Sequence, residues 1–193
     1  GEWLDQNKTI LPRVIAPHTD TSEKLKVVFM QSKPQCRVDV ERMSKTIGLL
    51  ADLAEIETML KPHTRAGEKG QIGEAKLPDV SHVLTAELCE WADVLLVVGS
   101  SVITEALMQG KPVLYLKYLH ENTTLFEDLG ACWIISNETE LKKALLALHK
   151  NKTDIPYGAD NITEFISQVV YGGGGRRDVL ADYEHFIVGC ASN

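Results

Sequence analysis

The segment that most constrains the fold runs from Ala92 to Gly110 and reads ADVLLVVGSSVITEALMQG. Residues 94–98 are consecutive apolar side chains, most of them β-branched, which is typical of a strand buried on both faces of a parallel sheet. Gly99-Ser100-Ser101, called the serine turn below, leads into a short amphipathic helix expected over 102–108. A new strand is expected from Val113. The segment therefore predicts a β-turn-α-β unit.

The serine turn is the candidate ligand site. It follows the carboxyl end of a parallel strand, where open α/β sheets bind ligands. The backbone N–H groups and the hydroxyls of Ser100 and Ser101 suit a phosphate. Glu105, on the same helix, is placed to accept hydrogen bonds from ribose hydroxyls. Ser101 is expected at the N-cap of the helix and Gly110 at its C′ position. The alternative for the site is purely structural: Ser100 and Ser101 only cap the helix, and Glu105 faces solvent.

The composition limits the class of protein. The 193 residues suit one large domain or two small ones, and the 44% apolar and 24% charged content is ordinary for a soluble globular chain. A net charge of −7 argues against a nucleic-acid-binding surface, and no segment approaches the ~20 apolar residues of a membrane span. The cysteines form no C-x-x-C pair, which disfavours a zinc site, and with no signal peptide they favour a cytoplasmic location.

The rest of the chain alternates strands with helices, which predicts an α/β fold with a mostly parallel sheet of about six strands. Residues 1–23 are expected to be a lead-in or linker, and residues 24–193 one Rossmann-like domain of three layers, α/β/α. The strands are expected at 24–30, 56–60, 79–84, 94–98, 112–119 and 131–136. The helices are expected at 38–53, 85–91, 102–108, 125–129, 138–150, 162–170 and 176–188. The missing G-x-G-x-x-G and G-x-x-x-x-G-K-[ST] motifs disfavour an NAD-type site and a P-loop.

A second polar cluster follows the strand at 56–60. Lys61, His63 and Arg65 place three anion-binding side chains after one strand end. Because crossovers of one hand bring such ends to the same side of a sheet, we predict that His63 and Arg65 line the same cleft as Ser100. The alternative is a solvated basic turn.

Two local motifs concern structure alone. NETE from Asn137 and NITE from Asn161 are asparagine versions of a helix capping box, so each asparagine is expected to begin a helix. The glycines at 172–175 are expected to form a flexible joint between the last two helices, because no strand precedes them.

With these residues in place, the chain resembles the carboxyl-terminal, nucleotide-donor-binding half of a GT-B glycosyltransferase. It is most similar to bacterial surface-polysaccharide enzymes and CDP-glycerol glycerophosphotransferases. LKPHTR at 60–65 resembles a family strand that ends in K-P-H. ADVLLVVGSSVITEALMQGKPV at 92–113 resembles the block D-x-x-I-x-x-x-S-S-x-x-x-E-A-L-x-x-G-K-P-V. YGGGGRRD at 171–178 loosely resembles a D-G-x-A-x-x-R turn, so the similarity spans 24–190.

The resemblance implies a set of binding residues but assigns no catalytic one. Glu105 is expected to bind the ribose of the donor. Its phosphates are expected to contact His63, Arg65, Gly99, Ser100, Ser101, Asn122 and Thr123. No metal or other cofactor is expected, because such enzymes generally need no bound metal.

The resemblance also implies a function and partners. The chain is expected to be the donor-binding domain of a glycosyltransferase in surface polysaccharide or glycoconjugate synthesis. Its donor is a nucleotide sugar, and a missing N-terminal domain binds a saccharide or lipid-linked acceptor. Val98-Gly99 stands where glycerophosphotransferases commonly have aspartate or tyrosine, which favours a sugar transferase.

Two alternatives stay open. One is a domain similar to nucleotide-sugar 2-epimerases, although Ser101 stands where that family has glycine. The other is a non-catalytic nucleotide-binding α/β module. Membrane association of the full-length protein is also left open.

Overall fold

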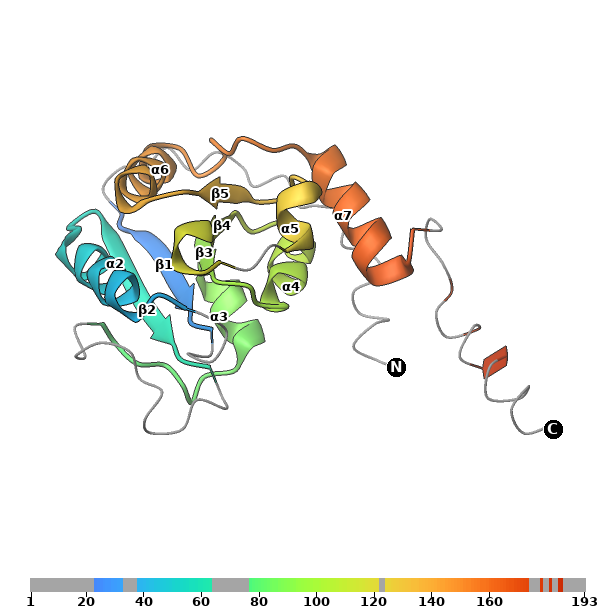
Figure 1. Ribbon diagram of the computed structural model, residues 1–193, viewed down its shortest axis with the longest axis horizontal. Coiled ribbons are helices and arrows are strands. Elements are labelled where there is room, and N and C mark those ends of the chain that lie inside the picture. Colours follow the sequence, from blue (N-terminus) through green and yellow to red (C-terminus); the bar gives the residue numbers. More distant parts are fainter. Residues whose placement is uncertain are drawn as a thin grey trace.

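A computed structural model describes residues 23–32, 38–63, 77–121, 124–173, 178, 181 and 184–185. In this part of the chain, parallel strands form one five-stranded sheet in the order β2-β1-β3-β4-β5 (Figure 1). The strands are β1 Leu25–Met30, β2 Ile56–Lys61, β3 Val94–Val97, β4 Val113–Leu116 and β5 Trp133–Ile135. The predicted α/β class is confirmed.

The helices alternate with the strands along the chain. They are α2 Val40–Asp52, α3 Thr85–Trp91, α4 Val102–Met108, the 3-10 helix η3 Lys117–Leu119, α5 Leu125–Asp128, α6 Glu138–Lys150 and α7 Ala159–Tyr171. No helix among the described residues combines the length and apolar character that crossing a membrane requires. The expected lead-in over 1–23 and the expected helix over 176–188 lie almost entirely outside the described residues.

The central strand explains the order of the sheet. β3 lies between β1 and β4, and Val94–Val98 are at most 1% exposed, so the predicted central position of this segment is confirmed. From β1 the chain moves outward to β2 and then returns past β1 to build β3, β4 and β5. This doubly wound order has its switch point between β1 and β3. Ligands of such sheets bind beyond the carboxyl ends of the strands at that point.

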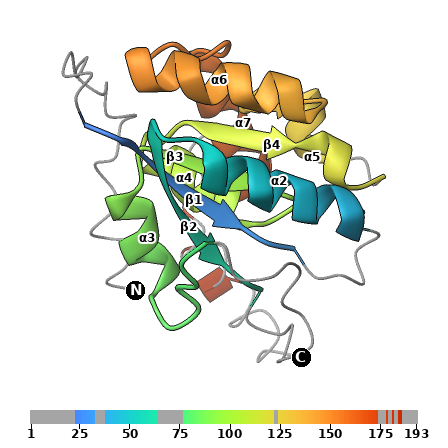
Figure 2. The same cartoon turned by 90° about the vertical axis from the view of Figure 1, so that its left-hand side faces the viewer.

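Helices cover both faces of the sheet. Val94, Leu96 and Val98 point to the face packed with α2 and α6, whereas Leu95 and Val97 point to the face packed with α3, α4 and α7. Figure 1 shows these two groups of helices on opposite sides of the sheet, and Figure 2 shows α2 and α6 along one face. The strand is apolar without alternation because neither face meets water. The predicted three-layer arrangement is confirmed.

The strand expected at 79–84 is not formed, which leaves the sheet one strand short of the prediction. Only Asp79 makes an isolated parallel bridge, to Leu60. The backbone carbonyls of Val80, Ser81 and Val83 accept hydrogen bonds from the buried ammonium of Lys61, and the chain forms a turn there. A strand there would need those carbonyls for a neighbouring strand.

The strand expected at 112–119 ends early, at Leu116, and residues 117–119 form η3. Tyr118 then packs against α2, where its hydroxyl pairs with Thr46 Oγ1 at 2.7 Å and its carbonyl accepts from Arg42 Nη1 at 3.2 Å. These contacts across the fold override the local apolar pattern.

The two asparagine motifs behave differently. Asn137 caps α6 as predicted: its Oδ1 accepts the Glu140 N–H at 2.9 Å, and Glu140 Oε2 accepts the Ser136 N–H at 2.8 Å. The prediction for Asn161 is wrong, because α7 begins earlier and its N-cap is Gly158. Asn161 Oδ1 instead accepts the Gly158 N–H at 3.0 Å, the role that glutamate has in a capping box.

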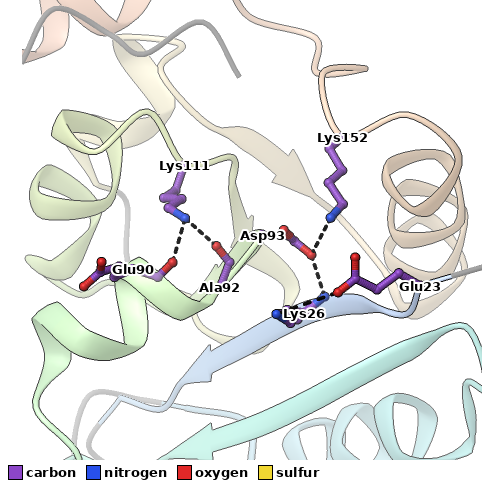
Figure 3. Close-up of polar contacts among 7 residues, drawn as sticks. All are labelled: Glu23, Lys26, Glu90, Ala92, Asp93, Lys111 and Lys152. Atoms are coloured by element: carbon purple, nitrogen blue, oxygen red, sulfur yellow. Dashed lines mark hydrogen bonds and ion pairs between the residues drawn. The ribbon is translucent and has the colours of Figure 1, made fainter. Parts of the chain in front are cut away.

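Polar contacts hold the amino ends of the strands together, at the edge of the sheet opposite the serine turn. Asp93 Oδ2 accepts from the backbone N–H of Lys26 at 2.9 Å and pairs with Lys152 Nζ at 3.0 Å (Figure 3). Lys111 Nζ donates to the carbonyl of Ala92 at 2.7 Å. The ammonium groups of Lys111 and Lys152 therefore make contacts that hold the fold together at this end of the sheet.

Candidate functional site

Two of the chain segments that carry predicted site residues leave the sheet at the same edge. Met30, the last residue of β1, is in register with Lys61 on β2 and with Val97 on β3. His63 and Gly99 each follow two residues later, so the chain leaves β2 and β3 at the same level. Neighbouring strands lie roughly 4.8 Å apart, which separates β2 from β3 by about 10 Å. We call this side of the sheet the carboxyl edge.

The serine turn connects β3 to α4 at the switch point. Gly99 has a φ of 61°, in the left-handed region that favours glycine. Ser101 holds the N-cap position as predicted, but it makes no side-chain cap hydrogen bond. The capping hydroxyl belongs to Ser100, whose Oγ accepts the Val102 N–H at 3.3 Å. Ser101 is exposed, so its hydroxyl is accessible at the turn.

The far end of α4 is also as predicted. Gly110 has a φ of 68°, and its N–H donates to the carbonyl of Leu107 at 3.0 Å. The N–H of Lys111 donates to the carbonyl of Ala106 at 2.9 Å. This pair of bonds is the Schellman motif, and it fixes the short helix at its carboxyl end.

The left-handed backbone of Gly99 can be tested by substitution. A Cβ at Gly99 would meet no atom within 4 Å, so Gly99→Ala introduces backbone strain alone. We expect a loss of about 1 kcal/mol in the free energy of unfolding, measured by urea denaturation. The control is Gly48→Ala within α2, which also has open space and no positive φ. It should stabilise the protein by roughly 0.5–1 kcal/mol, and equal effects at the two sites would contradict the assignment.

Glu105 lies in the first turn of α4 and is half-buried. Burial raises the pKa of its carboxyl group. Within the described residues its carboxylate has no hydrogen-bond or ion-pair partner. Burial raises the pKa of the Cys89 thiol on α3 to about 12, and the nearby carboxylate of Glu105 adds to that rise. Partial burial of a carboxylate costs free energy unless a partner offsets it, and no contact among the described residues offsets it for Glu105.

The other predicted site residues are described unequally. His63 is half-buried just beyond β2 at the carboxyl edge. Arg65, Asn122 and Thr123 lie outside the described residues, so their predicted contacts stay predictions. Lys61, which the sequence groups with His63, is buried and donates to backbone carbonyls, so it does not face a ligand directly.

The sequence gives no signal for one further histidine at the carboxyl edge. His120, 7% exposed, pairs through Nε2 with the hydroxyl of Tyr115 at 2.6 Å. Its backbone forms an antiparallel bridge with Val38, so the segments after β1 and β4 meet beyond the end of β3. His120 is therefore next to the switch point. Burial, reinforced by the charge of Lys117, lowers its pKa, so the ring is neutral at neutral pH.

No group of three or more His, Cys, Asp or Glu residues able to hold a metal ion occurs in the described ranges. That donor binding needs no metal stays a prediction.

Comparisons with solved structures match the fold to known glycosyltransferases. The chain is similar to the glycotransferase of kitacinnamycin, with 17% sequence identity and a TM-score of 0.56, over 90% of this chain and 46% of that one. It is similar to the spinosyn forosaminyltransferase SpnP, with 18% identity and a TM-score of 0.52, over 90% of this chain and 49% of that one. Neither a protein-family model nor a curated protein matches.

These similarities concern the fold. The chain spans about half the length of the two glycosyltransferases it resembles. The predicted resemblance to one half of a GT-B glycosyltransferase is thus confirmed for the architecture of the sheet and its helices.

Proposed function

We propose that this chain is the donor-binding domain of a glycosyltransferase that uses a nucleotide-activated sugar in polysaccharide or glycoconjugate synthesis. The observation that carries the proposal is the position of the serine turn. The strand order puts its switch point between β1 and β3, and the serine turn leaves β3 there.

The groups at the turn suit a nucleoside diphosphate. The positive φ of Gly99 turns the backbone sharply out of β3, and the exposed hydroxyl of Ser101 is accessible to a phosphate oxygen. Ser100 keeps its hydroxyl on the first turn of α4 and so fixes the shape of the turn. Backbone N–H groups in such turns bind phosphate without a counter-charge from a side chain.

Glu105 supplies the second part of the proposed site. A ribose has two vicinal hydroxyls that donate hydrogen bonds, and a carboxylate is acceptor-only when ionised. Ribose binding gives this half-buried carboxylate the partner that it lacks among the described residues. His63, at the same edge, is proposed to approach the donor phosphates, together with Arg65, Asn122 and Thr123.

We expect Glu105→Gln to weaken nucleoside diphosphate binding by about tenfold or more, because a charge-assisted hydrogen bond contributes about 1.5–3 kcal/mol. Calorimetric titration with ADP, CDP, GDP, UDP and dTDP measures this. Inorganic pyrophosphate has no ribose, so its affinity should stay equal or rise slightly as a negative charge is removed. Unchanged nucleotide affinity in a protein that binds nucleotide contradicts the ribose role.

Two controls separate binding from folding. Because burial raises the pKa of Glu105, its ionised form is disfavoured in the folded protein, and stability falls as pH rises through that pKa. At pH 7, Glu105→Gln should therefore leave the melting temperature unchanged or raise it. Glu87→Gln, at an exposed first-turn position of α3, makes the same chemical change and should alter neither affinity nor stability.

A turnover assay on the full-length protein tests transfer itself. Release of a nucleoside diphosphate from a nucleotide sugar only when an acceptor is present supports a glycosyltransferase. Conversion of the sugar without an acceptor identifies an epimerase-like enzyme instead. Binding without turnover identifies a non-catalytic module.

A further inference from the structure

Lys61 is a buried cation at the carboxyl edge. It is the last residue of β2 and is 7% exposed. Its Nζ donates to the carbonyl oxygens of Val80 at 3.4 Å, Ser81 at 2.6 Å and Val83 at 2.5 Å. The three donors of the ammonium are thus matched by three acceptors of one turn.

Among the described residues, all partners of the Lys61 ammonium are backbone carbonyls, and no carboxylate there forms an ion pair with its Nζ. Carbonyl dipoles solvate the ammonium without removing its positive charge. Salt and water screen such a buried charge much less than they screen the charge of a lysine on the surface.

Lys61 lies at the same end of the sheet as the proposed diphosphate site. It is level with Val97 across β1, two strands away from β3, the strand that leads into the serine turn. The backbones of β2 and β3 are two strand spacings apart, about 10 Å. At that range a buried charge attracts an anion without touching it, and the attraction grows with each charge on the ligand.

We propose that the buried ammonium of Lys61 makes the site at the serine turn favour donors that carry a diphosphate over donors that carry a monophosphate. This inference rests on the proposed function and deepens it, because it names the charge of the substrate that the site selects. Lys61 acts on the ligand through the electric field, with no direct contact.

The test measures how tightly the 193-residue chain binds a series of ligands of increasing negative charge, called the ladder below. The nucleoside diphosphate that binds best is identified first, and then the monophosphate and triphosphate of the same base are titrated. Lys61→Gln keeps an N–H donor for the carbonyls and removes the charge. We expect its binding loss to increase along the ladder, on the order of three- to fivefold for each added unit of ligand charge.

Lys61→Arg restores the charge and should restore the slope of the ladder. Asp79→Asn is the opposite control, because Asp79 is in the segment that leads into this turn and accepts the Ser81 N–H at 2.7 Å, a bond that asparagine can keep. Removing its negative charge should tighten binding most for the triphosphate. A melting curve for each variant records any loss of folding, which shifts all three ligands together.

The possible results separate the two proposals. Lys61→Gln weakening all three ligands by one common factor overturns the inference and leaves Lys61 as a structural anchor, while the proposed function stands. A wild-type chain that binds neither a nucleoside diphosphate nor inorganic pyrophosphate overturns the proposed function and this inference with it. A loss that grows with ligand charge, reversed by Lys61→Arg, supports both.

Discussion

Replacing Leu96 by alanine is expected to lower the free energy of unfolding by about 3–5 kcal/mol. Leu96 is fully buried at the centre of β3, the middle strand of the sheet. It is in register with Phe29 on β1 and Leu114 on β4, and all three belong to the core under α2 and α6. Rigid strands on both sides limit how far the core can close around the space that the substitution leaves.

Urea denaturation followed by circular dichroism measures this effect. The matched control is Leu84→Ala, since Leu84 is 67% exposed at the start of α3. That variant should stay within about 0.5 kcal/mol of the wild type. A loss below about 1 kcal/mol for Leu96→Ala, or equal losses for the two variants, would show that β3 does not hold the fold together.

The central unit could be predicted from the sequence because its signals are local. The apolar run of β3, the turn at Gly99 and the αL residue Gly110 each depend on neighbours within a few positions. The helices over 102–108 and 138–150 begin and end where the pattern places them. Local chemistry and the final fold agree in these segments, so no distant contact was needed to find them.

The rest could not be predicted, because distant contacts decide it. Lys61 reads as part of a basic turn, but its ammonium bonds to carbonyls up to 22 residues away. Those bonds convert the expected strand at 79–84 into a turn. Nothing in the sequence around His120 indicates its partners: its ring lies against Tyr115, and its backbone forms a bridge with Val38, two residues before α2. A linear pattern carries no sign of such partners.

The site is predicted in part for the same reason. The serine turn and Glu105 are in one continuous unit, and their common position at the switch point follows once the strand order is known. His63 reaches the same edge because parallel strands end together. That the hydroxyl of Ser100, and not that of Ser101, accepts the capping hydrogen bond from the Val102 N–H depends on side-chain rotation, which spacing does not fix.

Tyr115→Phe is expected to lower the free energy of unfolding by about 1–3 kcal/mol at pH 7, because it removes one partner of a buried hydrogen bond. The hydroxyl of fully buried Tyr115 pairs with His120 Nε2 at 2.6 Å. Tyr171→Phe on α7 is the control, since the hydroxyl of half-buried Tyr171 has no partner among the described residues, and it should change stability by less than about 0.5 kcal/mol.

The Tyr115–His120 pair makes the stability of the protein depend on pH, and the burial of His120 fixes the direction of that dependence. Burial and the charge of Lys117 lower the pKa of His120, while Glu127 opposes them more weakly. Below the ordinary histidine pKa of about 6.5, the unfolded chain therefore binds a proton that folded His120 resists. Stability contributed by neutral His120 is present above that pH and is lost as pH falls toward and through the lowered pKa.

His120→Gln isolates this effect, because glutamine keeps an acceptor for the tyrosine hydroxyl but does not titrate in this range. Urea denaturation at pH 7 and pH 5 should show a larger loss of stability for the wild type than for the variant. Carboxylates that do not interact with His120 contribute equally to both proteins, so they cancel in the difference; Glu127, which does interact with it, adds to the part that the substitution removes. Equal losses in the two proteins would mean that His120 titrates as it does in water, and that the bond to Tyr115 does not hold the ring in its neutral form.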